Sequence, residues 1–151
     1  KKITNWNYVS IDLKSPLADI KANVYNLPFK ENYFDLILCN HVLEHIEDDY
    51  KALNELHRVI KNKGTLIAQV PFDKNLKKTY ENKEIMNPRD RNKFFGQYDH
   101  VRVYGLDFYA RLTKSGFKPK KIDILKKMSR EEKIKYCLPE DEEIPIGIAV
   151  K

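Results

Sequence analysis

The sequence predicts an α/β fold with a mostly parallel sheet, because a strand, a helix and a second strand follow one another within residues 34–72. Phe34 to Cys39 (FDLILC) is a short apolar run without alternation, which is typical of a strand covered on both faces. Residues 48–63 form an amphipathic helical pattern, and TLIAQVPF at 65–72 is a second buried run. This order predicts one right-handed crossover of a parallel sheet.

The predicted helix has signals at both ends. Asp48 and Asp49 provide an N-cap and an acidic first turn. Lys61 and Lys63 suit the negative end of the helix, and Gly64 suits the left-handed residue that would close it. The inward face consists of apolar residues at helical spacing: Ala52, Leu53, Leu56, Val59 and Ile60.

The rest of the chain alternates strands and helices without a repeat. Further strands are expected at 8–13, 20–24, 121–125 and 145–150, the last of them antiparallel, and further helices at 107–116 and 129–136. Asp73 to Asn92 shows no clear strand and at most a short helix after Pro88. We therefore expect a Rossmann-like three-layer sandwich in a single domain, 1–151, in which an insertion at 73–105 covers the substrate.

Composition predicts a one-domain protein with an ordinary solvated surface. The chain has 151 residues, and its net charge of +6 comes from lysines spread along the sequence. Nucleic acid or another anionic partner stays open but is not indicated. Cys39 and Cys137 form no disulfide or metal pattern, and no apolar stretch has the length of a membrane span. We expect a cytoplasmic protein.

The carboxyl ends of two predicted strands mark a candidate site. Ligands of parallel sheets lie outside the carboxyl ends of the strands. Asn40 and His41 follow one such strand, and Pro71 and Phe72 end the next. We expect these four residues beside a ligand.

Several motifs occur in an order that resembles one enzyme family. They are Asn26-Leu27-Pro28-Phe29, Phe34-Asp35, Val42-Leu43-Glu44-His45, a helix with Arg58-Val59-Ile60 followed by Gly64, and a late DHVRVYGLDFYARLTKSGF. Together they resemble the class I S-adenosylmethionine-dependent methyltransferases of the type 11 group, over nearly the whole chain. The resemblance implies S-adenosylmethionine as cofactor and methyl transfer to a small or surface-exposed acceptor as the activity.

The resemblance also implies cofactor roles. Asp12 matches the acid that accepts hydrogen bonds from the ribose hydroxyls. Asn23 stands where the family usually has an aspartate for the adenine amino group, and its carbonyl oxygen accepts the same bond without a charge. The other implied contacts are Leu13 on the adenine ring, the backbone N–H of Val24 to that ring, and Asn40 and His41 at the methionine end.

Methyl transfer needs mainly alignment, since the sulfonium is already a good leaving group. If the acceptor is protonated, His41 and His100 are candidate bases, and a structural or substrate-orienting role is the alternative for each. Residues 94–104 would form a flap over the acceptor, in which Arg102 suits a carboxylate or phosphate. A surface loop packed on its own domain is the alternative to a flap. The candidate substrate contacts are Tyr98, Asp99, His100, Arg102 and Tyr104.

A zinc hydrolase is a remote alternative. His41-Val42-Leu43-Glu44-His45 fits H-x-x-E-H, in which two histidines on one helical face bind zinc and the glutamate is the base. The later glutamates offer no clear third ligand, and a protease leaves the flanking motifs without a role. We therefore expect no metal.

One part of the implied fold has no counterpart in the sequence. In that fold a central strand and a glycine-containing loop precede the Asp12 strand, whereas the five glycines here all come at or after Gly64. We expect an N-terminally truncated domain with an incomplete, weakly binding cofactor site, unless its strands close up or pair with a second copy in a homodimer. A non-catalytic or degenerate binding domain with the methyltransferase fold is the alternative to an enzyme.

Overall fold

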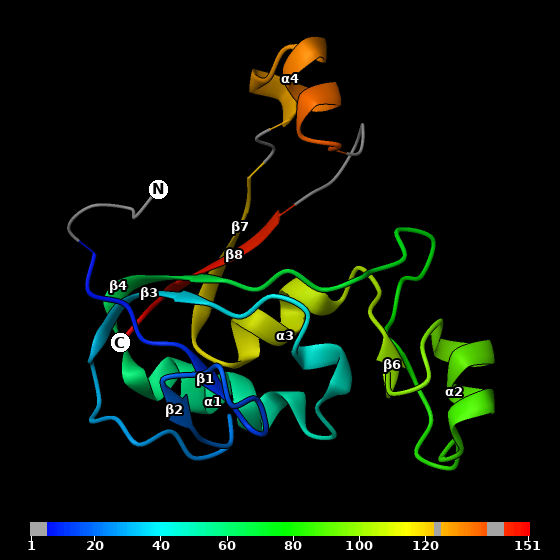
Figure 1. Cartoon of the computed structure of the whole chain (residues 1–151), viewed down its shortest axis with the longest axis horizontal. Coiled ribbons are helices and arrows are strands. Elements are labelled where there is room, and N and C mark those ends of the chain that lie inside the picture. The colour runs from blue at the N-terminus through cyan, green and yellow to red at the C-terminus, as the bar shows by residue number, and fades with distance from the viewer. Residues whose placement is uncertain (1–5, 123–124, 139–143) are drawn as a thin grey trace.

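The structure is a computed structural model that describes residues 6–122, 125–138 and 144–151 (Figure 1). The strands are β1 (Ile11–Asp12), β2 (Ile20–Lys21), β3 (Phe34–Leu38), β4 (Ile60–Ile67), β5 (Tyr80–Glu81), β6 (Arg102–Val103), β7 (Phe117–Ile122) and β8 (Ile144–Ala149). The helices are α1 (Asp49–Val59), α2 (Pro88–Phe95), α3 (Phe108–Lys114) and α4 (Arg130–Lys135), with 3₁₀ turns η1 (Leu43–His45) and η2 (Leu125–Lys127).

The main sheet has the strand order β3-β4-β8-β7. β3 and β4 pair in parallel, and β8 is antiparallel to both β4 and β7. β3, β4 and β7 therefore run in one direction, and only the last strand opposes them. The predicted α/β class and the antiparallel last strand are confirmed.

β1 and β2 form a parallel pair of their own. Among the described residues no strand ladder joins this pair to β3, which is an edge strand of the main sheet. Ile11, Ala22 and Val24 still pack against the hydrophobic core. The pair is thus attached to the domain through apolar side chains. Both strands are also shorter than the sequence pattern predicted.

The end of α1 differs from the prediction. The helix stops at Val59, and Ile60 already begins β4, so Lys61 and Lys63 belong to a strand and not to a last helical turn. Gly64 is buried inside β4, and the positive φ of 63° is found at Lys63. Glycine is needed at 64 for another reason. A Cβ there would lie 2.7 Å from Ile60 Cγ1 and 3.2 Å from the Asp35 carbonyl oxygen, where β4 bulges against β3.

Residues 73–105 contain more regular structure than expected. The short helix predicted after Pro88 is confirmed as α2, which is capped by Asn87 and ended by Gly96 at a φ of 84°. β5 was not predicted, and it pairs antiparallel with β6. Figure 1 shows this segment at the right of the view, beyond the end of the main sheet.

The C-terminal elements largely follow the prediction. α4 has the capping box of Ser129 and Glu132, and α3 ends just before Gly116. The predicted strand at 121–125 is displaced, because β7 occupies 117–122; positions 123 and 124 lie outside the described residues. Asp107 does not cap α3 with its side chain, since its carboxylate accepts hydrogen bonds from Thr79 instead.

The core lies between the main sheet and helices α1 and α3 (Figure 1). The predicted inward face of the first helix is confirmed for its four residues within α1, all of which are buried; the fifth, Ile60, is buried too but belongs to β4. α3 contributes Phe108 and Leu112, which are also buried. This packing fixes where the carboxyl end of β3, the 3₁₀ turn η1 and the start of α1 lie.

Candidate functional site

Asn40 and His41 lie at the carboxyl end of β3, as expected. The His41 N–H donates to the Gln69 carbonyl at 2.8 Å, and the Gln69 N–H donates to Asn40 Oδ1 at 3.4 Å. Both side chains are exposed. His41 has a φ of 54°, a left-handed conformation that is uncommon outside glycine and occurs at functional turns.

Asp12 ends β1 and turns the chain with its own carboxylate. Oδ1 accepts hydrogen bonds from the backbone N–H groups of Lys14 and Ser15, both at 2.7 Å. These two bonds, from Ser15 first and then Lys14, hold the pKa of Asp12 below its ordinary value. The exposed carboxylate is therefore ionised at neutral pH. Leu13 beside it is 52% exposed.

Asn23 and Val24 lie in a tight turn after β2. Asn23 Oδ1 accepts from the Tyr25 N–H at 3.0 Å, and the Asn26 N–H donates to the Asn23 carbonyl at 2.9 Å. The side-chain oxygen that would accept the adenine amino group is thus already used in the turn. Val24 is half-buried against the core.

Arg102 is buried and bonded to protein groups. It donates to the carbonyls of Leu43, Ile46 and Glu47, and its Nε lies 2.9 Å from Glu81 Oε2. Burial would lower the pKa of Arg102, but the surrounding negative groups outweigh it and raise that pKa. The predicted free cation over a substrate is therefore not what the structure shows.

Tyr104, which was expected to contact the substrate from the flap, is fully buried as well. Its hydroxyl donates to Asp49 Oδ2 at 2.9 Å and lies 3.2 Å from the Leu43 carbonyl oxygen. Burial, with the charge of Asp49 adding to it, raises its pKa. Of the expected substrate contacts, Tyr98 is exposed, at 62%, Asp99 is partly exposed, and the other three are buried.

Sequence reasoning missed the ion network behind this segment. Arg111 of α3 binds Asp49 of α1 and Glu81 of β5, so one guanidinium joins three elements. The sequence does not reveal the partners of Arg111, because they lie 62 and 30 residues away from it. A charged residue on the apolar side of a predicted helix was the available signal.

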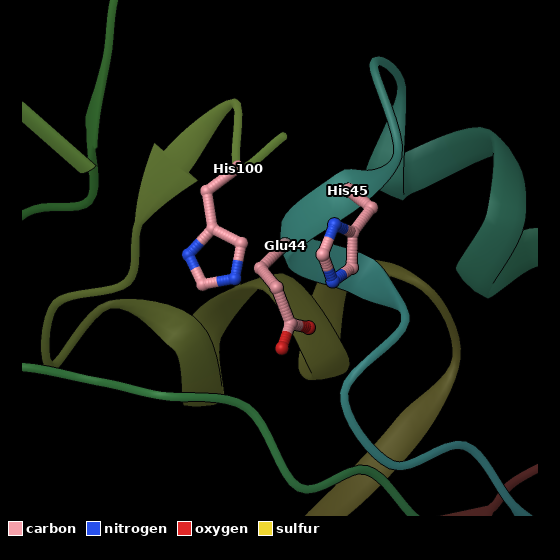
Figure 2. Close-up of side chains that lie close together, drawn as sticks. All are labelled: Glu44, His45 and His100. Atoms are coloured by element: carbon pink, nitrogen blue, oxygen red, sulfur yellow. The ribbon is translucent and has the colours of Figure 1, made fainter. Parts of the chain in front are cut away.

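A second group of polar side chains lies between η1 and the residues before β6. Glu44, His45 and His100 come together there, and Figure 2 shows the two imidazole rings on either side of the Glu44 carboxylate. His41 Nδ1 lies 3.1 Å from Glu44 Oε1.

Burial, with the charge of Glu44 adding to it, raises the pKa of the Cys39 thiol to about 12, so Cys39 remains protonated at neutral pH.

A surface pocket of about 520 Å³ lies along α1, away from these groups. Its lining residues are Tyr25, Asp48, Tyr50, Lys51, Asn54, Glu55 and Arg58. None of them is a predicted cofactor or substrate residue.

Among the described residues, no helix is long and apolar enough to cross a membrane.

Known proteins match the chain in sequence and in fold. Residues 5–68 match the family model described as "Methyltransferase domain", a region that includes Asp12, Asn40 and His41. The predicted resemblance to the methyltransferases is confirmed. The structure of this chain superposes with a TM-score of 0.59 on the Burkholderia thailandensis 1,6-didemethyltoxoflavin-N1-methyltransferase. That match covers 93% of this chain and 60% of the other at 14% identity, so it supports the fold.

Two curated relatives show how much of a longer protein the chain resembles. An uncharacterized protein of Methanocaldococcus jannaschii, MJ1123, is 31% identical over 138 residues, which cover 83% of this chain and 64% of the relative. The ubiquinone/menaquinone biosynthesis C-methyltransferase of Vibrio cholerae is 41% identical over 49 residues, 32% of this chain and 19% of the enzyme. The chain therefore spans less than two thirds of the length of these relatives.

Proposed function

We propose that this chain serves methyl transfer from S-adenosylmethionine to a small or surface-exposed acceptor. The exposed, ionised carboxylate of Asp12 at the end of β1 carries the proposal. It lies within the region that matches the methyltransferase family model. The structural neighbour from Burkholderia thailandensis was solved with S-adenosylhomocysteine, the demethylated form of the cofactor.

Asp12 and Leu13 would bind the nucleoside half of the cofactor. Asp12 Oδ1 is committed to the turn, and the second carboxylate oxygen is the acceptor we assign to the ribose hydroxyls. Leu13 exposes an apolar face directly after it, on which a purine ring would bury surface. These two residues fit the cofactor.

Asn40 and His41 would hold the methionine end and face the acceptor. His41 is the better placed of the two candidate bases, because it is exposed while His100 is buried. The carboxylate of Glu44, 3.1 Å from His41 Nδ1, would orient the ring and keep Nε2 available for an acceptor proton. The cofactor supplies the electrophilic methyl group; the protein aligns the acceptor with it.

The segment before β6 would border the acceptor through Tyr98 and Asp99. We assign Arg102 and Tyr104 a supporting role, since both are bonded to η1 and α1. Their bonds would fix the position of the acceptor-side segment rather than contact the acceptor itself.

A non-catalytic binding domain with the same fold is the second candidate. The bond from the Tyr25 N–H to Asn23 Oδ1 favours it, because this bond competes with recognition of the adenine amino group. The separation of the β1–β2 pair from β3 favours it too, since the two halves of a cofactor site would then be less firmly joined. We accordingly expect affinity for S-adenosylmethionine weaker than micromolar in the 151-residue chain.

The substitution Asp12→Asn tests the proposal sharply. Asparagine keeps the turn, because its Oδ1 can still accept from Lys14 and Ser15, but it replaces the second acceptor oxygen with a donor. Equilibrium dialysis with labelled S-adenosylmethionine should show at least a tenfold loss of affinity, about the worth of one charge-assisted hydrogen bond. The control Asp35→Asn changes an exposed carboxylate on β3 and should bind normally. Equal affinities of the Asp12→Asn and wild-type chains would exclude the ribose role.

A further inference from the structure

The cluster of Glu44, His45 and His100 has the composition of a metal site. One ligand atom from each side chain lies within 4.8 Å of the other two. Two histidines and one glutamate make up a known set of protein ligands for zinc, with a fourth position left to water or substrate. Around a zinc ion with bonds of about 2.0 Å, ligand atoms stand about 3.3 Å apart. Small side-chain movements would therefore close the cluster on an ion.

Glu44 supplies the strongest sign that a ligand is expected here. Its side chain is 2% exposed, and Oε2 is buried and has no hydrogen-bond partner among the residues that the structure describes. A buried carboxylate oxygen left unpaired is costly, and each such atom in a native protein calls for an explanation. Oε1 is accounted for by His41, so the unpaired atom is the one available to an ion.

Both histidines are oriented as metal ligands are. His100 Nδ1 lies 3.2 Å from the Phe95 carbonyl oxygen; since a carbonyl only accepts, Nδ1 carries the hydrogen and Nε2 keeps its lone pair. His45 Nδ1 lies 3.3 Å from Asp99 Oδ2, which favours the same tautomer. Metal-binding histidines in proteins commonly have the other ring nitrogen held by a carbonyl or a carboxylate in this way.

The backbone already holds the two halves of the cluster together. The Val101 N–H donates to the Glu44 carbonyl at 2.9 Å, and Arg102 donates to the carbonyl of Leu43. His45 remains partly exposed, with 29% of its side chain open to solvent, which gives an ion a way in. Such preorganisation lowers the cost of assembling a site from residues 55 positions apart in the chain.

We propose that Glu44 Oε2, His45 Nε2 and His100 Nε2 bind one zinc ion, or a similar divalent transition ion, that clamps η1 to the segment before β6. The proposal does not depend on methyl transfer. It also differs from the inverted zincin pairing of the H-x-x-E-H motif, because His41 supports Glu44 and does not bind the ion.

Zinc titration of the chelator-treated chain tests the stoichiometry and the ligands. We expect one zinc per chain by competition with a chromophoric chelator, and at least a tenfold loss of affinity in His45→Gln and in His100→Gln. The matched control is His57→Gln, because His57 does not belong to the cluster and its Nε2 contacts the Val150 carbonyl oxygen; this variant should bind zinc as the wild type does. Absence of stoichiometric zinc, or affinity that survives both substitutions, would overturn the proposal.

A measurement on the unsubstituted chain avoids any question of misfolded variants. In ¹⁵N spectra of the imidazole rings, zinc should shift Nε2 of His45 and His100 strongly, and leave the ring nitrogens of His57 in place. A large shift of Nε2 of His41 would instead assign the ion to the His41–His45 pair and refute our ligand set. Zinc should also raise the unfolding temperature of the wild type and not that of His45→Gln.

Discussion

Arg111 forms a buried ion pair with Asp49, with Nη1 at 3.0 Å from Oδ1 and 2.9 Å from Oδ2. The two side chains are 9% and 3% exposed. Arg111 lies in α3 and Asp49 is the first residue of α1, so the pair fixes one helix against the start of the other. Burial alone would lower the pKa of Arg111, but the hydrogen bond to Glu81 and the charge of Asp49 outweigh it and raise that pKa.

Breaking this pair should destabilise the domain strongly. Arg111→Met leaves Asp49 charged and buried, and removal of one partner from such a pair typically costs about 3–5 kcal/mol. Lys61→Met is the matched control, because Lys61 pairs with Asp35 on the surface and should cost below about 1 kcal/mol. Urea unfolding measures both. Similar losses in the two variants would contradict the structural role given to Arg111.

Glu81 should make stability depend on pH in the acidic range. Burial tends to raise the pKa of Glu81, but Arg111 and Arg102 hold it below the ordinary 4.5. A lowered folded-state pKa means that the stabilisation is fully present above about 4.5 and is lost as the pH falls below it. The free-energy difference between wild type and Glu81→Gln should therefore shrink from pH 7 to pH 3. A difference that stays constant or grows on acidification would show that the two arginines do not stabilise the charged form.

Gly116 and Gly96 offer a clean pair of substitutions. Both have left-handed backbones, with φ of 86° and 84°, so alanine costs about 1 kcal/mol at either position. A Cβ on Gly116 would also lie 2.6 Å from His57 Nε2, whereas a Cβ on Gly96 would meet no atom of the described residues within 4 Å. Thermal unfolding should show a larger loss of stability for Gly116→Ala than for Gly96→Ala. Adding His57→Ala to Gly116→Ala removes the contact and should recover part of that loss. Equal losses in the two single variants would argue against the contact with His57.

Local pattern was enough to predict the class of the fold and the inward face of α1. It misplaced the end of that helix because Gly64 reads as a helix terminator. In the structure Gly64 is needed because β3 and β4 approach each other closely at this position. The spacing of residues in the sequence does not reveal such a contact between strands. β5 is only two residues long and is stabilised by pairing with β6, so no periodic signal exists for it.

The candidate site was predictable only where it follows strand ends. Asn40 and His41 were found from the position of β3 alone. The burial of Arg102 and Tyr104 was not, because their partners Leu43 and Asp49 lie 55 to 61 residues away. His45 and His100 are equally distant in the sequence, so their contact was not predictable either. The H-x-x-E-H motif suggested His41 instead of His100 as the second histidine of a zinc-binding pair.

We propose that the ends of β1 and β3 together form the cofactor site. The most direct measurement is a backbone amide NMR titration of the chain with S-adenosylhomocysteine, which detects even millimolar binding. We predict shifts centred on Asp12, Leu13, Asn40 and His41 that vanish in Asp12→Asn. Shifts centred instead on Tyr50, Lys51 and Arg58 in the pocket along α1, or shifts that persist unchanged in Asp12→Asn, would contradict this placement of the cofactor.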